Sequence, residues 1–187
     1  MADPRRGAGI CVSSSSPVAP ADMRIREATD ADFDAMWAIF QSVVATGDTL
    51  PFSSATSDDF FRAQWLGHGG GSFVVSLGTT LCGMYKFGPN LPGLGSHVAS
   101  ATYLVRPESQ GRGIGRAMVE HSLAQAEQAG FAAMQFNFVV ATNEPAIRLY
   151  EKLGFSIVGT LPKAFQHRQL GMVDAHVMHR FLGVAGD

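Results

Sequence analysis

The sequence predicts one mixed α/β (α+β) domain, with a mostly antiparallel central sheet of about seven strands and flanking helices. Strand-like and helix-like periodicities alternate along the chain in the order β-α-α-β-β-β-α-β-α-β-β. We expect one parallel crossover in an otherwise antiparallel sheet. The 187 residues are 46% hydrophobic and 16% charged, which is enough apolar material for one core.

The elements in the first half are bounded by caps and turns. Thr29 and Asp32 form a capping-box pattern at the start of the first helix, and apolar residues then recur at helical spacing. The polar segment 46–54 is either a loop that closes over a ligand or a surface connection. A Gly-Thr-Thr turn at 78–80 joins two strands as an antiparallel hairpin. The first-half strands are 24–28, 73–77 and 81–87, and the helices are 29–44 and 57–66.

Glycine and asparagine residues mark the helix ends in the second half of the chain. Gly130 ends one helix, and Gly154 ends the next. Asn143 is a capping residue, with Pro145 in the first helical turn. Strands are predicted over 97–105, 132–140, 155–160 and 174–181, and helices over 113–129 and 143–153.

Residues 1–22 are rich in Ser, Ala, Pro and Gly, and we expect them to form a disordered leader before a single domain over 23–187. Met23 is an alternative start. No apolar run is long enough to cross a bilayer, so no membrane association is expected.

Charge and cysteine content exclude several classes of function. A net charge of -2 and a pI near 6.3 provide no basic surface for nucleic acid. Cys11 and Cys82 form no CxxC pair, so neither a disulfide framework nor a zinc site is indicated, and a reducing cytoplasm is favoured. His176 and His179 fall on opposite faces of a predicted strand, and no metal site is expected.

The most informative segment is Val-Arg-Pro-Glu-Ser-Gln-Gly-Arg-Gly-Ile-Gly-Arg at 105–116, where a strand enters a glycine-rich turn and then a helix. Backbone N–H groups at such a helix start converge on one space, which suits a pyrophosphate. Arg116 stands where a dinucleotide fingerprint needs its third glycine, and the Lys-Ser/Thr pair of a Walker A loop is absent.

Two motifs together resemble the GCN5-related N-acetyltransferase (GNAT) superfamily. The first is Q-x-x-G-x-G, carried by Gln110, Gly113 and Gly115. The second is N-x-x-A-x-x-x-Y-x-x-x-G-F, which begins at Asn143 and ends at Phe155. The resemblance covers most of residues 24–182 and implies the acyl-CoA N-acyltransferase fold.

The resemblance implies an acyltransferase that uses acetyl-CoA as its co-substrate. It also implies that the strands 97–105 and 132–140 splay apart to admit the pantetheine arm, beside free backbone N–H groups of the first strand. The cofactor-binding residues carried over are Tyr103, Leu104, Val105, Gln110, Gly111, Arg112, Gly113, Ile114, Gly115, Arg116 and Asn143.

Tyr150 is the expected catalytic general acid, because a phenol keeps its proton at neutral pH and can protonate a departing thiolate. The alternative is an aromatic residue that only packs its helix on the sheet. Asn143 has two expected tasks, capping its helix and contacting the cofactor arm. The proposed acetyl transfer is a direct attack in a ternary complex.

Asn137 and Ser100 are the expected substrate-binding residues. Asn137 stands in an apolar strand, where it faces either the acceptor pocket or a neighbouring loop. The general base stays unassigned. His97, or a water held by Ser100 and Asn137, can serve, whereas Glu108 in the phosphate loop is too distant.

The expected acceptor is the amine of a small molecule. Segments 136–138, 160–162 and 173–175 loosely resemble family members that acetylate amino or imino acids, which points to an amino acid or analogue. A protein N-acetyltransferase is the alternative, and a non-catalytic acyl-CoA sensor is another. Family resemblance also implies a homodimer.

Overall fold

The computed structural model describes residues 22–67 and 71–183. The predicted leader, residues 1–22, lies outside these ranges except for Asp22. No helix in the described part of the chain has the length and hydropathy needed to span a membrane.

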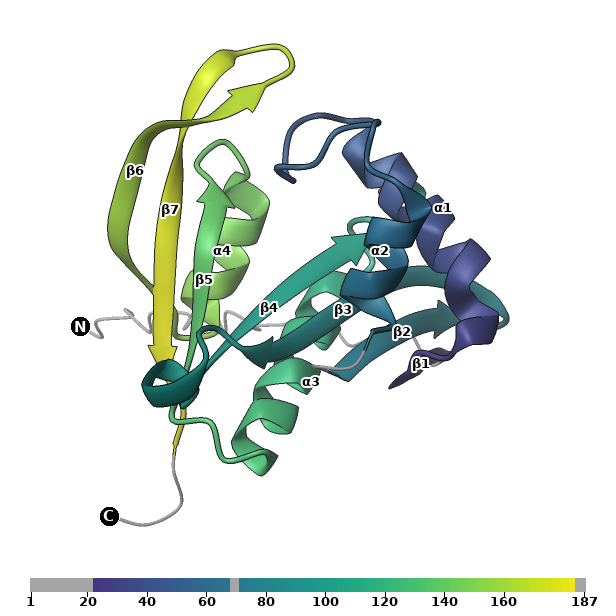
Figure 1. The fold of residues 1–187 in the computed structure, drawn as a ribbon, viewed down its shortest axis with the longest axis horizontal. Helices are drawn as coiled ribbons and strands as arrows, with labels where there is room; N and C mark the ends of the chain where they lie inside the picture. Colours follow the sequence, from purple (N-terminus) through teal and green to yellow (C-terminus); the bar gives the residue numbers. More distant parts are fainter. Residues whose placement is uncertain (1–21, 68–70, 184–187) are drawn as a thin grey trace, which may run out of the picture.

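The described residues form seven strands, four α-helices and three short 3-10 turns (Figure 1). The strands are β1 (Met23–Glu27), β2 (Gly71–Leu77), β3 (Thr80–Pro89), β4 (Val98–Val105), β5 (Ala133–Val140), β6 (Ser156–His167) and β7 (Gly171–Phe181). The helices are α1 (Phe33–Val44), α2 (Asp58–Trp65), α3 (Ile114–Gln128) and α4 (Glu144–Lys152). The 3-10 turns are Asp30–Asp32, Gly93–Gly95 and Pro107–Ser109.

All seven strands belong to one sheet, in the order β1-β2-β3-β4-β5-β7-β6. The β4–β5 pair is parallel, and the other neighbouring pairs are antiparallel. The predicted fold class, with its mostly antiparallel sheet and one parallel crossover, is therefore confirmed.

Helices cover both faces of the sheet. Helices α1 and α2 pack on the face that presents Val74, Met84 and Leu104. The opposite face presents Val75, Tyr85 and other buried residues to α3, and α4 packs on the β5 end of that face. The alternation of side chains along each strand supplies both cores.

The parallel pair β4–β5 comes apart almost at once. Its register contains two Cα pairs, Val98 with Ala133 and Ala99 with Met134. Beyond them β4 stays paired with β3 and β5 stays paired with β7, so the two strands diverge (Figure 1). The splayed gap implied by the family resemblance is present.

The predicted helix starts form as expected. The capping box joins Thr29 and Asp32, and the Asp32 carboxylate also accepts two hydrogen bonds of 2.7 Å from Arg26. Ser57 accepts from the backbone N–H of Phe60 at the start of α2.

The β6–β7 hairpin is much longer than predicted, because the expected strands stop at 160 and begin again at 174. β6 is an edge strand, and most of its residues are exposed, so no alternating apolar pattern marks its second half. Its Pro162 also reads as a strand breaker, but an edge strand tolerates proline. A register shift between Leu161 and Phe165, with Lys163 at φ 52°, accommodates this irregular stretch.

Candidate active site

A cleft of about 1010 Å³ occupies the gap between β4 and β5. Its walls come from the end of α1 and the loop after it, from β4, the glycine-rich turn, β5, α4 and the tip of the β6–β7 hairpin. The volume matches the upper end of ordinary ligand sites, about 300–1,000 Å³. Every site residue predicted from the sequence lines this cleft except Leu104 and Arg112.

The glycine-rich turn adopts a backbone that needs glycine at two positions. Gly111 has φ +74° and Gly113 has φ +79°, both in the left-handed region. A Cβ atom at either residue would meet no atom within 4 Å, so conformation and not packing requires these glycines. The open space beside them is available to a ligand.

Backbone N–H groups that have no partner among the described residues line the start of α3. The first intrahelical bond at this end runs from Ala117 N to Gly113 O, 3.0 Å. The N–H groups of Ile114, Gly115 and Arg116 therefore precede the helical ladder and remain available for an anion. Gln110 differs, because its N–H donates to Pro107 O at 3.3 Å. The Ile114 side chain is buried in the core, so only its backbone can contact a ligand.

Positive charge at the glycine-rich turn comes mainly from the partial charges of the backbone N–H groups. Arg116 lines the cleft, but its Nε donates to Glu120 Oε1 at 2.8 Å, which offsets its charge. Arg112 is exposed and does not line the cleft. The helix dipole of α3 adds partial positive charge at the same place.

The edge of β4 that faces the gap carries its own free donors. Arg106 N donates to Cys82 O of β3, 2.8 Å, and hydrogen-bonding direction alternates along a strand. The N–H of Leu104 therefore faces β3, where Leu104 pairs with Met84. The N–H groups of Tyr103 and Val105 face the gap, and β5 no longer pairs there. The alternation favours Tyr103 and Val105 over Leu104 as donors to a ligand.

Tyr150 extends from α4 into an aromatic cluster at the gap. Its ring centroid lies 4.6 Å from that of Phe136 and 6.3 Å from that of Tyr103. Burial raises the pKa of its phenol above the ordinary value of 10.0. Within residues 22–67 and 71–183 no side chain or backbone group hydrogen-bonds its hydroxyl. The hydroxyl is thus protonated and free to donate.

Asn143 caps α4, since its side-chain oxygen accepts from the backbone N–H of Ala146 at 3.4 Å. This oxygen is one end of the amide, and the NH₂ end makes no hydrogen bond within the described residues. The residue also lines the cleft. One side chain can therefore cap the helix and still donate to a ligand.

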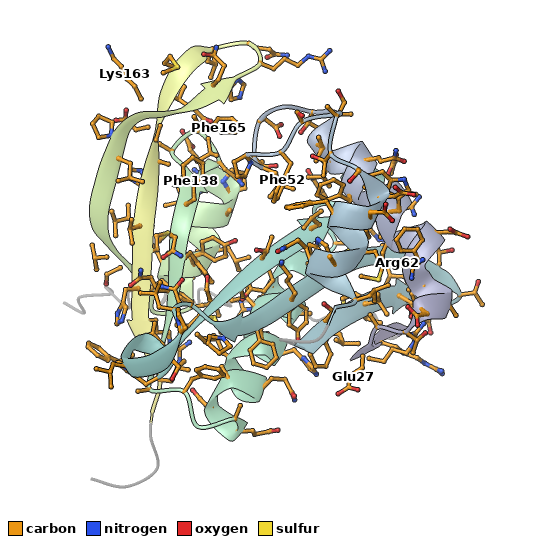
Figure 2. All side chains as sticks on the ribbon, in the orientation of Figure 1. Glu27, Phe52, Arg62, Phe138, Lys163 and Phe165 are labelled. Carbon is orange, nitrogen blue, oxygen red and sulfur yellow. The ribbon has the colours of Figure 1, made fainter. Side chains whose placement is uncertain are left out.

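The far end of the cleft is enclosed by the loop after α1 and by the β6–β7 hairpin. Figure 2 shows Phe52 of the loop opposite Phe138 and Phe165. The hairpin tip is fastened to the loop, because Arg168 N donates to Gly47 O at 3.0 Å and Arg168 Nη1 donates to Ala45 O at 2.6 Å. Segment 46–54 was expected to be either a loop that closes over a ligand or a surface connection. This geometry agrees with the first alternative.

The sequence left open whether Asn137 faces the acceptor pocket or a neighbouring loop, and in the structure it does both. It stands where β5 shifts register, and it lines the cleft. Its amide also pairs with that of Asn90, donating to Asn90 Oδ1 at 2.5 Å and accepting from Asn90 Nδ2 at 3.3 Å. Gln135 donates to the same oxygen at 2.7 Å. Ser100 lines the cleft from β4.

The expected base candidates do not all reach the cleft. His97 lies at the paired end of β4, where its Nδ1 is 3.1 Å from Leu94 O, and Glu108 is exposed in the turn; neither residue lines the cleft. Asp48 and His167, which the sequence did not single out, do line it. Only tertiary packing brings them there.

His167 is held as a hydrogen-bond donor. Its Nδ1 accepts from the backbone N–H groups of Gln169 and Leu170, at 3.1 and 3.2 Å. With Nδ1 occupied as an acceptor, the ring proton is on Nε2, which can donate to an acceptor molecule. Over the described residues, no cluster of three or more His, Cys, Asp or Glu side chains is placed to hold a metal ion.

Comparison with known proteins decides the family. The model of the Acetyltransferase (GNAT) family matches residues 34–155, which include the glycine-rich turn and the α4 motif. The chain belongs to the GNAT family. The resemblance stated from the two sequence motifs is confirmed, and the matching relatives are N-acetyltransferases, in agreement with the enzyme class expected from the sequence.

Solved and curated GNAT relatives agree with this assignment. The structure of a GCN5-related N-acetyltransferase from Kribbella flavida superposes with a TM-score of 0.84 at 39% identity, covering 88% of this chain and 100% of that chain. N-acetyltransferase aca1 of Schizosaccharomyces pombe is 38% identical over 100 residues, 53% of this chain and 48% of its own length. The [ribosomal protein bS18]-alanine N-acetyltransferase of Escherichia coli is 38% identical over 74 residues, 40% of this chain and 49% of its own length. This GNAT chain spans about half the length of these two curated relatives.

The residues of this GNAT chain fit acetyl-CoA, which the family uses as co-substrate. The glycine-rich turn offers converging N–H groups beside open space, as a pyrophosphate requires. The gap-facing N–H groups of Tyr103 and Val105 suit the amides of a pantetheine arm. Tyr150 stands farther along the same cleft, beside the gap.

Proposed function

We propose that this chain transfers the acetyl group of acetyl-CoA to the amine of a small molecule, an amino acid or an analogue, by direct attack in a ternary complex. The observation that carries the proposal is the single cleft lined by the glycine-rich turn, the free edge of β4, Tyr150 and a closed acceptor end. Each of these parts has a separate task in the transfer.

The glycine-rich turn binds and orients the donor. The N–H groups of Ile114, Gly115 and Arg116 donate to the pyrophosphate oxygens, with the α3 dipole adding to the attraction. Asn143 donates its amide NH₂ to the cofactor arm while its oxygen caps α4. These contacts hold the thioester beside β4.

The free edge of β4 stabilises charge as the amine attacks. A backbone N–H of Tyr103 or Val105 donates to the thioester oxygen, which gains negative charge in the transition state. Fixed donors at that position cost little reorganisation during the reaction. Ser100 and Asn137 lie at the acceptor side and orient the incoming amine.

Tyr150 acts as the general acid. Burial keeps the pKa of its phenol above that of a free tyrosine, so the hydroxyl is protonated at physiological pH. The leaving thiolate, with a pKa of about 8.5 by analogy with cysteine, receives a hydrogen bond and then the proton from it. The acceptor nitrogen loses its proton to water in the cleft as the amide forms, and Tyr150 regains a proton from water. Asp48 is the acidic side chain among the described residues of the cleft wall, and it attracts the ammonium form of the acceptor.

A protein N-terminus is the alternative acceptor, as the name of the Escherichia coli relative suggests. The contacts of Arg168 with Ala45 and Gly47 favour the small molecule, because they close the cleft where a polypeptide would need an open groove. A sensor without chemistry is disfavoured by the free, protonated hydroxyl of Tyr150.

The test is thiol release from acetyl-CoA in the presence of three acceptor groups: free amino and imino acids, other small amines, and short peptides with a free N-terminus. We expect release with members of the first group. Release with peptides alone would establish the protein-modifying alternative. Coenzyme A binding without release for any acceptor would establish the sensor.

A further inference from the structure

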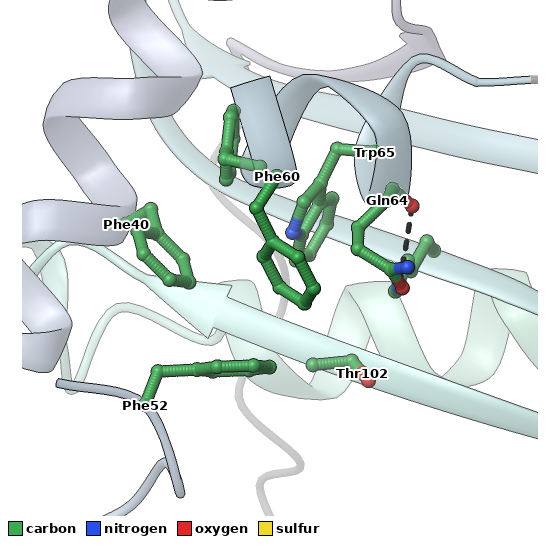
Figure 3. A pocket seen from close by; sticks show the side chains of 8 residues that line it. Phe40, Phe52, Phe60, Gln64, Trp65 and Thr102 are labelled. Atoms are coloured by element: carbon green, nitrogen blue, oxygen red, sulfur yellow. Dashed lines mark hydrogen bonds between the residues drawn. The ribbon is translucent and has the colours of Figure 1, made fainter. Parts of the chain in front are cut away.

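A second, smaller cavity adjoins the acceptor end of the cleft. Its volume is about 50 Å³, and it shares Phe52 and Thr102 with the main cleft (Figure 3). The other lining residues come from α1, α2 and β3: Phe40, Phe60, Phe61, Gln64, Trp65 and Lys86. We call it the side pocket.

Lys86 is the charged group of the side pocket. Its Nζ donates to Gln64 O and to Gln64 Oε1, both at 3.1 Å, and lies 5.5 Å from the ring centroid of Trp65. An ammonium carries three N–H donors, so one remains after these two bonds. The side chain is held in place with a donor to spare.

No acidic side chain of the described residues lies within 4.0 Å of the Lys86 ammonium, so its charge has no ion-pair partner in that part of the chain. Burial, which removes water from the ammonium, lowers the pKa of Lys86. Arg116, the other lysine or arginine on the walls of the two cavities, is engaged by Glu120 at the pyrophosphate end. An anion at the acceptor end would neutralise Lys86.

The register of the sheet places Lys86 next to the reaction. Lys86 pairs with Thr102 across β3 and β4, so the two side chains lie on the same face. Thr102 lines both cavities, and the adjacent Tyr103 carries one of the N–H groups that face the gap. An acceptor that reaches the side pocket therefore still lies beside the edge of β4.

We propose that Lys86 binds the carboxylate of an α-amino or α-imino acid acceptor in the side pocket. This inference rests on the proposed function, and it names the chemical class of the acceptor. A volume of about 50 Å³ has room for about three water-sized groups, which suits the three heavy atoms of a carboxylate.

The aromatic walls strengthen this selection. Phe52, Phe60 and Trp65 limit water around the ammonium, so its attraction for an anion exceeds that of an exposed lysine. A peptide N-terminus presents an uncharged carbonyl at the equivalent position. It would leave Lys86 without a counter-charge, which favours the free amino acid over the peptide.

The experiment compares free α-amino and α-imino acids with their carboxamides in the thiol-release assay. Wild-type protein is expected to prefer the acids by tenfold or more in kcat/KM, since hydrogen bonds to charged groups have about that effect. Lys86→Met should raise KM for the acids about tenfold and remove the preference, with kcat and coenzyme A affinity little changed. Lys86→Arg should restore part of the preference.

Lys163→Met is the matched control, because Lys163 is an exposed lysine on the hairpin (Figure 2), and it should leave the preference intact. If Lys86 only tied α2 to β3, Lys86→Met would lower the melting temperature. The ratio of kcat/KM between acids and carboxamides would then stay unchanged. Equal use of acids and carboxamides by wild type, or an unchanged ratio in Lys86→Met, would overturn the proposal.

Calorimetry of the same acid and carboxamide pairs, in the presence of coenzyme A, measures recognition without turnover. Tighter binding of the acid that is lost in Lys86→Met supports the role of Lys86 whether or not thiol is released. Absence of thiol release alone would count against the proposed function and not against this binding role.

Discussion

At the scale of single residues, the site depends on groups whose hydrogen-bonding roles are set by their surroundings. Burial raises the pKa of Tyr150, and two backbone N–H groups occupy Nδ1 of His167, so its Nε2 is the donor. The sequence motif led to Tyr150, because its spacing from Asn143 and Phe155 is characteristic. It did not lead to His167, Asp48 or Lys86, because no local pattern surrounds them and only tertiary packing brings them to the cleft.

Tyr150→Phe is expected to lower kcat by about 10²-fold or more, because the departing thiolate loses its proton donor. The dissociation constant of coenzyme A should change little. Because burial raises the pKa of Tyr150, its ionisation should produce no fall in kcat of the wild type between pH 7 and about pH 10.

Tyr85→Phe is the matched control for this change. Tyr85 also has a hydroxyl, which contacts His121 Nδ1 at 2.5 Å, but it does not line the cleft. Its loss should affect stability and leave kcat within a small factor. Equal turnover by Tyr150→Phe and wild type would remove Tyr150 from the role of general acid.

Asp32 anchors the N-terminal part of the fold. Hydrogen bonds from Arg26, together with those from Thr29, hold the pKa of the Asp32 carboxyl well below its usual range. Asp32→Asn should lower the free energy of unfolding at pH 7 by about 1–2 kcal/mol, less than a fully buried pair because Arg26 is half-exposed.

The pH dependence of that difference has a definite sign. The folded-state pKa is depressed, so the stabilisation is complete above the unfolded pKa of about 3.9 and is lost as the pH falls below it. Urea unfolding at pH 7 and pH 3 should therefore show a smaller gap between wild type and Asp32→Asn at pH 3. Asp34→Asn, at an exposed position of α1, is the control and should change stability by less than about 0.5 kcal/mol.

At the scale of elements, the sequence was most informative where turn chemistry is local. The glycine-rich turn, the capped start of α4 and the capping box at Thr29 all follow from residues a few positions apart. The β6–β7 hairpin was underestimated because its outer half is exposed and contains Pro162. Its contact with Gly47 joins segments more than a hundred positions apart, and no local pattern predicts it.

Gly113→Ala tests the glycine-rich turn as an element. Alanine at φ +79° costs roughly 1–2 kcal/mol, and relief of that strain turns the first N–H groups of α3 away from one another. Coenzyme A affinity should fall about tenfold by calorimetry.

Gly159→Ala controls for the added methyl group. Gly159 also has open space around its Cβ position, but it lies in β6, away from the turn, and its φ is outside the left-handed region. Unaltered affinity in Gly113→Ala would show that the turn does not hold the pyrophosphate.

At the scale of the whole molecule, one feature of the sheet organises the rest. β4 and β5 are the only parallel neighbours in the described sheet, and they separate after two residue pairs. The gap exposes donors on β4, receives Tyr150 from α4 and ends at the turn before α3. The order of helices and strands along the chain was predictable from periodicity, but the separation of β4 and β5 followed only from the family resemblance. The homodimer that the resemblance implies stays a prediction.

We propose that this gap and the start of α3 together bind an acyl-CoA. Calorimetric titration of the full chain with coenzyme A measures this binding. We expect saturable binding of one coenzyme A per chain. A well-folded protein that releases no heat of binding across a range of temperatures would contradict it.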